Sequence, residues 1–187
     1  MPQIDISSLP LGEYVAGFRD AVTCLEACRQ CRNYGQLWCC PPLGFDVDAM
    51  LGSYANATIV LASFPWPSAT DYTALMAHVS PARLALERQL ITVESPLDGR
   101  AFGFSGECLL CRQCRRPLAL PCAHPDKVRP SLEACGFNVC ATVEQLFGQS
   151  MEWAAHGCNP HTLRLVGAIF HNAPIAEAKK MMRRMDI

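Results

Sequence analysis

The pattern of apolar positions predicts two buried β-strands. Residues 57–64 read ATIVLASF, a β-branched and apolar run of strand length that Pro65 and Pro67 end. A similar run, LRLVGAIF, occupies residues 163–170 towards the other end of the chain. We expect both runs to lie in the hydrophobic core.

Apolar residues recur at helical spacing in three further segments. In the longest, from Asp71 to about Val93, Pro81 predicts two helices or one kinked helix, because proline disfavours helical backbone in the residue before it. Residues 142–147 predict a short helix, and residues 173–185 predict a basic final helix. Strands and helices alternate without a sustained β-α-β rhythm. We therefore predict a compact α+β fold with a single domain, residues 1–187, that is ferredoxin-like in part.

Charge and hydropathy exclude several classes of function. The net charge is −1, too small to attract nucleic acid or an anionic membrane to the whole surface. The N-terminal residues, MPQIDISSLPLGEY, lack the basic and apolar stretches of a secretory signal. No apolar run is long enough for a membrane span. We therefore expect a cytoplasmic protein with neither a nucleic-acid partner nor a membrane span.

Cysteine usage points to metal chemistry. The chain has 12 cysteines in 187 residues, most of them in residues 24–40 and 108–122. Cysteines this close in sequence seldom bridge to one another, because the loop between them is too small for relaxed disulfide geometry. A secreted disulfide scaffold would also carry an export signal. The spacing suits thiolates that converge on a metal centre, so we predict two cysteine-rich metal-binding loops.

The second cysteine group gives the stronger prediction. Cys108, Cys111 and Cys114 are each two residues apart, and Cys122 follows after a proline-containing loop. A C-x-x-C-x-x-C run with a fourth cysteine from elsewhere is typical of a 4Fe-4S cluster, whereas two separated pairs usually hold zinc. Cys122 could serve this cluster or a neighbouring one. A structural zinc site is the alternative.

The first cysteine group offers more thiols than one cluster needs. Its members are Cys24, Cys28, Cys31, Cys39 and Cys40. Cys28, Cys31 and Cys39 are separated by two and then seven residues, a spacing that the second group repeats and that supports two similar centres. Side chains of adjacent residues diverge on an extended chain, so we expect only one of Cys39 and Cys40 to face the metal. The group predicts a second 4Fe-4S cluster, with a zinc site or a mixture of core cysteines as alternatives.

Four motifs span roughly residues 24–140. They are Asn33-Tyr-Gly with Cys40-Pro-Pro, Cys108-x-x-Cys-x-x-Cys114, Cys122-x-His-Pro125 and Arg129-Pro-Ser-Leu-Glu-Ala134. Together they resemble a prokaryotic family of cysteine-rich predicted metal-binding proteins of unknown function. The resemblance implies metal or iron–sulfur ligation by the second group together with Cys31 and Cys40, and implies no particular reaction. Cys39 departs from the family pattern, so the choice between Cys39 and Cys40 stays open.

Four polar residues could support the metal or bind a substrate. His124 follows Cys122 by two, and we expect it to hydrogen-bond to cluster sulfur rather than to ligate. Ser131 could cap a helix, with Glu133 near the positive helix end. Alternatively, Arg129, Ser131 and Glu133 line a substrate pocket beside the cluster.

Three functions are compatible with these features. The first is electron transfer or redox chemistry with a partner protein, carried by one or two 4Fe-4S clusters. The second is an enzyme whose cluster offers an open iron to a small substrate. The third is a zinc-stabilised interaction domain.

Overall fold

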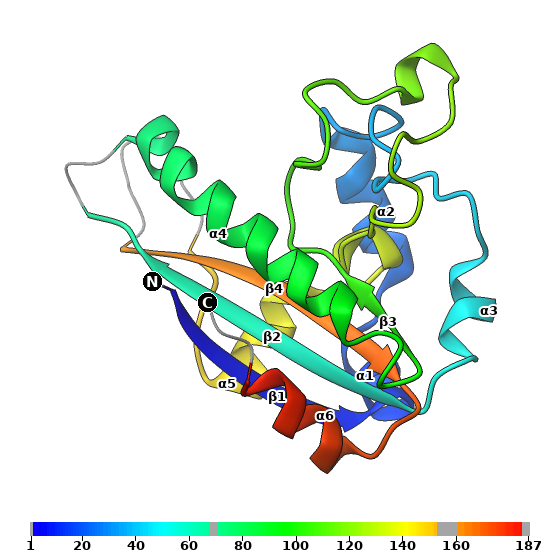
Figure 1. Ribbon diagram of the computed structural model, residues 1–187, viewed down its shortest axis with the longest axis vertical. Helices are drawn as coiled ribbons and strands as arrows, with labels where there is room; N and C mark the ends of the chain where they lie inside the picture. The colour runs from blue at the N-terminus through cyan, green and yellow to red at the C-terminus, as the bar shows by residue number, and fades with distance from the viewer. Residues whose placement is uncertain (1, 68–70, 153–160, 185–187) are drawn as a thin grey trace.

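The centre of the fold is a four-stranded antiparallel sheet. The computed structural model describes residues 2–67, 71–152 and 161–184, and its strands follow the order β1-β2-β4-β3 (Figure 1). Their bounds are Gln3–Pro10 for β1, Asn56–Pro65 for β2, Gly99–Phe102 for β3 and Thr162–His171 for β4. The central pair, β2 and β4, contains both strands that the sequence predicts, so that prediction is confirmed.

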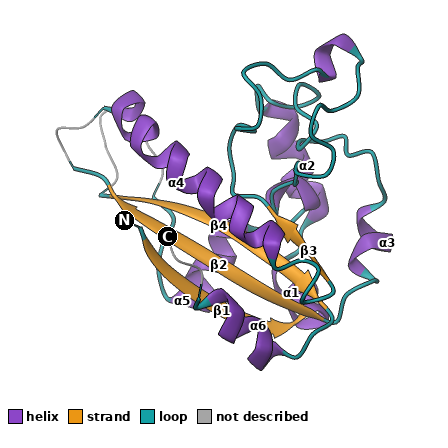
Figure 2. Cartoon of the chain, viewed as in Figure 1, coloured by secondary structure: helices purple, strands orange, loops and turns teal. Residues whose placement is uncertain are grey.

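Helices cover both faces of the sheet (Figure 2). On one face, α1 (Leu11–Phe18) and α5 (Val139–Phe147) pack against the side chains of Ile59 and Leu61. On the other face, α4 (Tyr72–Thr92) and α6 (Ile175–Met182) pack against Val60 and Ala62. Alternate residues of β2 therefore serve two separate cores, which explains why its sequence is apolar on both sides.

Helix α4 is continuous through Pro81. Of the two predicted alternatives, two helices or one, the structure has the single helix. Proline has no N–H to donate to the carbonyl four residues earlier in the helix. Because Pro81 is exposed, that carbonyl lies on the solvent side, where water can bond to it. The side chain of Asp71 caps the helix by accepting the N–H of Ala74 at 2.8 Å.

The topology confirms the α+β class. Strands β2 and β3 are each antiparallel to β4, which lies between them, and are therefore parallel to each other. Helix α4 connects them, giving the split β-α-β unit that ferredoxin-like folds contain. Strand β1 pairs with the other side of β2. No helix in the described part of the chain is both long and apolar enough to span a membrane.

Residues 19–46 and 105–131, here called the cysteine lobe, extend beyond the β3 end of the sheet (Figure 1). The lobe contains α2 (Ala21–Gln30) and a single 3₁₀ turn, η1 (Arg116–Leu118), while α3 (Val47–Leu51) follows its first segment. Isolated bridges of Arg19 with Phe137 and of Gly103 with Ser131 join the base of the lobe to the rest of the molecule.

The first cysteine group is not confined to a loop. Cys24 and Cys28 lie on helix α2, which corrects the prediction of two cysteine-rich loops. The side chain of Asp20 begins the helix by accepting the N–H of Thr23 at 3.0 Å. The C-x-x-x-C spacing places both thiols one turn apart on the same helix face.

Candidate metal centre

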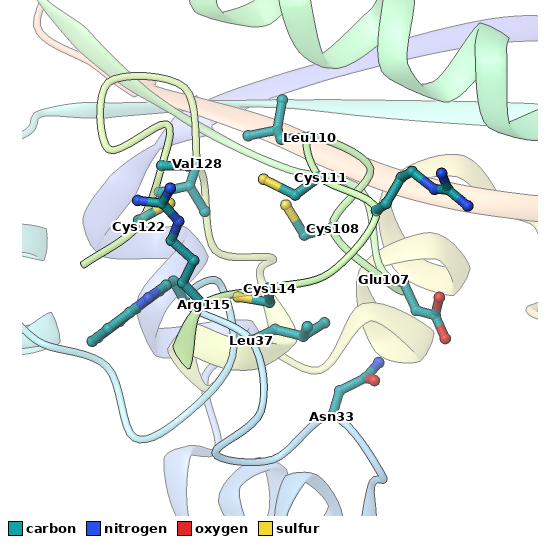
Figure 3. A pocket seen from close by; sticks show the side chains of 13 residues that line it. Asn33, Leu37, Glu107, Cys108, Leu110, Cys111, Cys114, Arg115, Cys122 and Val128 are labelled. Carbon is teal, nitrogen blue, oxygen red and sulfur yellow. The ribbon is translucent and has the colours of Figure 1, made fainter. Parts of the chain in front are cut away.

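The four cysteines of the second group line one cavity. Cys108, Cys111, Cys114 and Cys122 surround a space of about 230 Å³ (Figure 3). Asn33 and Leu37 reach the same cavity from the first cysteine segment. A cavity of this size is far larger than the roughly 10–15 Å³ that one water molecule needs. The structure thus places these four thiols around a space with room for more than a single ion.

Burial and neighbouring thiols disfavour the ionised form of Cys108 and Cys122. The pKa of Cys122 is raised by burial and then by the neighbouring thiols of Cys108, Cys114 and Cys111. The pKa of Cys108 is raised by its hydrogen bond with Cys39 and by burial. The Cys122 sulfur also accepts the backbone N–H of His124 at 3.4 Å. Four thiolates here would need a bound cation or cationic cluster to compensate their charge.

The first group forms a second neighbourhood of thiols. The pKa of Cys28 is raised by burial, then by Glu133 and by the thiols of Cys24 and Cys31. The Cys31 sulfur accepts the N–H of Asn33 at 3.5 Å. Backbone N–H donors to sulfur, as at Cys31 and Cys122, are a feature that tunes iron–sulfur sites.

Cys40 completes the first neighbourhood. The pKa of Cys40 is lowered by a hydrogen bond from Cys39, against burial and the nearby thiols of Cys31 and Cys28, and the Arg116 guanidinium lowers it further. Cys140, an exposed residue of α5, is a further thiol near Cys24. The sequence gives no signal for this neighbour, because more than a hundred residues separate the two positions.

Cys39 lies between the two groups. Its sulfur is 3.9 Å from that of Cys40, and it lines one small cavity together with Cys108, whose thiol shifts its pKa. The Cys108 thiol lowers the pKa of Cys39, but the bond with Cys40 and burial raise it more, to about 12. The two adjacent thiols do not diverge as predicted, because residues 37–40 form a turn closed by the Cys40 N–H and the Leu37 carbonyl at 3.0 Å.

Arg116 and Trp38 fasten the two cysteine segments to each other. The Arg116 guanidinium donates to the carbonyls of Leu37, Cys40 and Pro42 at 2.6–2.7 Å. It also lies 5.2 Å from the Trp38 ring centroid, and the Trp38 indole donates to the Leu120 carbonyl at 3.1 Å. Such charge-assisted bonds fix relative position. The two groups are therefore held together as one unit.

Arg83 and Gly106 position the chain that leads into Cys108. Arg83 is 2 % exposed and donates to the carbonyls of Ser105 and Glu107. Gly106 has φ +108°, and a Cβ there would be 2.7 Å from an Arg83 nitrogen, so this position requires glycine. Sequence reasoning missed Arg83, because a lone arginine in an amphipathic helix gives no signal of its distant partners.

Two of the three predicted pocket residues, Arg129 and Ser131, line a small cavity of about 30 Å³ together with Cys39, Cys40 and Cys108. All three also have partners within the protein. Arg129 forms two hydrogen bonds of 2.6 Å with the Glu94 carboxylate. Glu133 accepts the Ser105 hydroxyl. Ser131 caps only a 3₁₀ turn, η2 (Glu133–Cys135), by accepting the N–H of Ala134 at 3.3 Å.

His124, the predicted hydrogen-bond donor to sulfur, also lies beside the second cysteine group. His124 lines a neighbouring cavity with Glu87 and Lys127, and its backbone N–H donates to the Cys122 sulfur. The predicted hydrogen bond from His124 to sulfur therefore comes from the main chain.

The donor set suits a soft metal or an iron–sulfur cluster. In the ranges that the structure describes, no three side chains of Cys, His, Asp or Glu converge closely enough to hold a single ion. Both neighbourhoods nevertheless consist of thiols, which select zinc, Cu(I) or iron–sulfur clusters over hard cations such as magnesium.

Comparison with known proteins agrees with a metal-binding assignment. The family model "Predicted metal-binding protein (DUF2284)" matches residues 18–170, which include both cysteine groups. The chain belongs to this family. No curated protein and no solved structure matches the chain. Family membership supports metal binding and leaves the identity of the metal to experiment.

Proposed function

We propose that the protein binds two 4Fe-4S clusters and transfers electrons to a partner protein in the cytoplasm. One cluster would be held by Cys108, Cys111, Cys114 and Cys122. The other would be held by Cys24, Cys28, Cys31 and one of the adjacent pair, for which the nearby thiols favour Cys40. When bound, such clusters supply one-electron redox chemistry at potentials set by charge, hydrogen bonds and solvent exposure.

One observation carries this proposal: the thiols form two neighbourhoods that meet at Cys39. Cys39 and Cys40 of the first group line one small cavity together with Cys108 of the second, and Arg116 holds the two segments in a fixed relation. A pair of centres this close suits electron passage between them. Two independent structural zinc sites would have no need of this contact.

The chain's own residues would set the electrostatics of both centres. The Arg116 guanidinium lies close enough to Cys40 to lower its pKa, and so favours thiolate there. Arg112 and Arg115 line the cavity of the second group. These cations would offset part of the negative charge of a four-thiolate cluster and raise its potential.

The decisive experiment counts iron, acid-labile sulfide and zinc in protein purified without oxygen. Two clusters predict about eight irons per chain. Cys111→Ser and Cys28→Ser should each lose about half of the iron, because each removes a ligand from a different cluster. Cys140→Ser is the matched control, since this thiol lies near Cys24 but outside both sets of four ligands. This variant should retain all of its iron.

Two outcomes would change the assignment. Stoichiometric zinc without labile sulfide would replace electron transfer by a zinc-stabilised interaction domain. A loss of all iron in both Cys111→Ser and Cys28→Ser would indicate one shared centre. Comparison of Cys39→Ser with Cys40→Ser identifies which of the adjacent cysteines is the ligand.

A further inference from the structure

A second cavity adjoins the one that the second cysteine group lines and shares Trp38, Cys122 and Val128 with it. Its volume is about 340 Å³, within the roughly 300–1,000 Å³ typical of small-molecule sites. Its walls are mostly aromatic and proline side chains, with Arg100 as their one cation among the described residues: Trp38, Phe45, Pro121, Pro125 and Pro130. No described Asp or Glu lines it. The cavity therefore combines a flat apolar surface with a single positive charge.

Arg100 is fixed in place but not satisfied by the protein. It belongs to strand β3, opposite Phe170 in the register, and its guanidinium lies 5.1 Å from the Phe45 ring centroid. Its Nε is buried and has no hydrogen-bond partner in the described part of the chain, where it also forms no ion pair. A buried donor without a partner is costly, so a bound acceptor would recover that free energy.

The neighbouring arginines differ from Arg100, because the protein uses each of them internally. Arg129 pairs with Glu94, Arg116 donates to three carbonyls, and Arg83 donates to two. Glu133, an acid of the same region, accepts the Ser105 hydroxyl. Arg100 is therefore the one described cation that lines this cavity, and no described protein group accepts from its Nε.

We propose that this cavity binds a small carboxylate with a flat apolar body. The carboxylate would accept hydrogen bonds from Arg100, whose planar fork matches its two oxygens. The apolar body would pack between the Trp38 and Phe45 rings and the proline wall. A phosphate fits less well, since the lining supplies one cation and little else to hold a doubly charged group. This proposal does not depend on which metal the cysteines bind.

Isothermal titration calorimetry on the full-length protein tests the site, with benzoate as the probe. Benzoate should bind, and benzamide, which has the same shape without the charge, should bind at least about tenfold more weakly. Acetate, which lacks the apolar body, and inorganic phosphate should also bind more weakly than benzoate. Arg100→Met should weaken benzoate binding at least about tenfold, Arg100→Lys should weaken it less, and Arg88→Met, an exposed arginine of α4, should leave it unchanged.

Several results would overturn the assignment. These are no benzoate binding at millimolar concentration, equal binding of benzoate and benzamide, phosphate binding as tight as benzoate, or an equal loss in Arg88→Met. Metal content is measured in every variant. If Arg100→Met keeps its metal but no longer binds benzoate, the result supports the site. If the variant loses both its metal and benzoate binding, Arg100 stabilises the cysteine lobe instead.

Discussion

Arg83 shows how a single residue can connect the sheet to the cysteines. It occupies a position on the buried face of α4 that otherwise carries apolar residues such as Val79 and Leu86. A buried cation needs acceptors or a counter-charge. Here the two terminal nitrogens donate to the carbonyls of Ser105 and Glu107, directly before Cys108, and the Glu87 carboxylate lies 3.5 Å from Nε. The charge therefore fixes the segment that enters the second cysteine group.

We predict that Arg83→Met lowers the free energy of unfolding by about 2–4 kcal/mol, because two part-buried carbonyls lose their donor and Glu87 loses its cation. Urea denaturation measures this change. Arg83→Lys should recover part of it, since an ammonium group can reach one carbonyl. Arg88→Met on the exposed side of the same helix should change stability by no more than about 0.5 kcal/mol. Equal effects at both positions would contradict the role assigned to Arg83.

His171 predicts a dependence of stability on pH. Its ring is fully buried and lies 3.0 Å from both the Thr58 hydroxyl and the Ala173 carbonyl. Burial lowers its pKa below the ordinary 6.5, so below that pH the unfolded chain binds a proton that the native state does not. Stability should therefore fall as pH drops below about 6.5, by up to about 1.4 kcal/mol per pH unit, until the native pKa is reached.

Urea denaturation of the unmodified protein at pH 7, 6 and 5.5 measures this slope. His171→Gln should remove the His171 contribution to the slope, whatever its effect on absolute stability. His78→Gln, at an exposed position of α4, should retain it. A slope that is identical in all three proteins would assign the pH dependence to other groups.

At the scale of elements, helix α4 tolerates Pro81 at a measurable cost. Proline removes one helical hydrogen bond and crowds the preceding turn, and the helix remains continuous because that turn faces water. We predict that Pro81→Ala stabilises the protein by about 1–3 kcal/mol. Ala85→Pro, one turn further along the exposed side, should destabilise it by about 3 kcal/mol or more. Thermal unfolding of both variants tests this, and a destabilised Pro81→Ala would mean that the proline is needed.

The contact between the two cysteine segments is also a property of elements rather than of single residues. Arg116 supplies three charge-assisted hydrogen bonds across it. We predict that Arg116→Met increases amide hydrogen exchange in residues 31–42 at least about tenfold, since each 1.4 kcal/mol of lost local stability is one factor of ten. Hydrogen exchange with mass spectrometry measures it. Arg115→Met, an exposed neighbour, should leave exchange unchanged, and equal exchange in both variants would show that Arg116 does not hold the segments together.

At the scale of the whole molecule, the sequence predicts the parts that depend on local pattern. The two central strands and the α+β class follow from uninterrupted apolar runs, which no exposed segment could carry. Strand β1 and helices α1 and α2 are missed, because their residues are mostly half-buried or exposed and their patterns are weak. The spacing of the cysteines predicts which of them are candidate ligands. How the two groups are arranged in space depends on long-range contacts such as that of Cys39 with Cys108. No local pattern encodes those contacts.

The distribution of the core predicts which part of the molecule depends on metal. Both segments of the cysteine lobe, residues 19–46 and 105–131, contribute no buried hydrophobic side chain to either core. The sheet, its four covering helices and connecting residues such as Leu97, Leu132 and Phe137 supply those cores. From the lobe, only the half-buried Leu43 packs against one of them. The lobe therefore relies on polar contacts and on whatever its thiols bind, since bound metal adds directly to folding free energy.

We predict that removal of the metal by a chelator under reducing conditions loosens the lobe and leaves the sheet folded. Amides of residues 24–40 and 107–125 should lose protection against hydrogen exchange, while those of β2 and β4 keep it and urea unfolding of the body stays cooperative. Reloading the metal should restore protection in the lobe alone. Loss of protection throughout β2 and β4 would mean that the metal holds the whole fold. Unchanged exchange in the lobe would mean that its polar contacts, Arg116 foremost, suffice without metal.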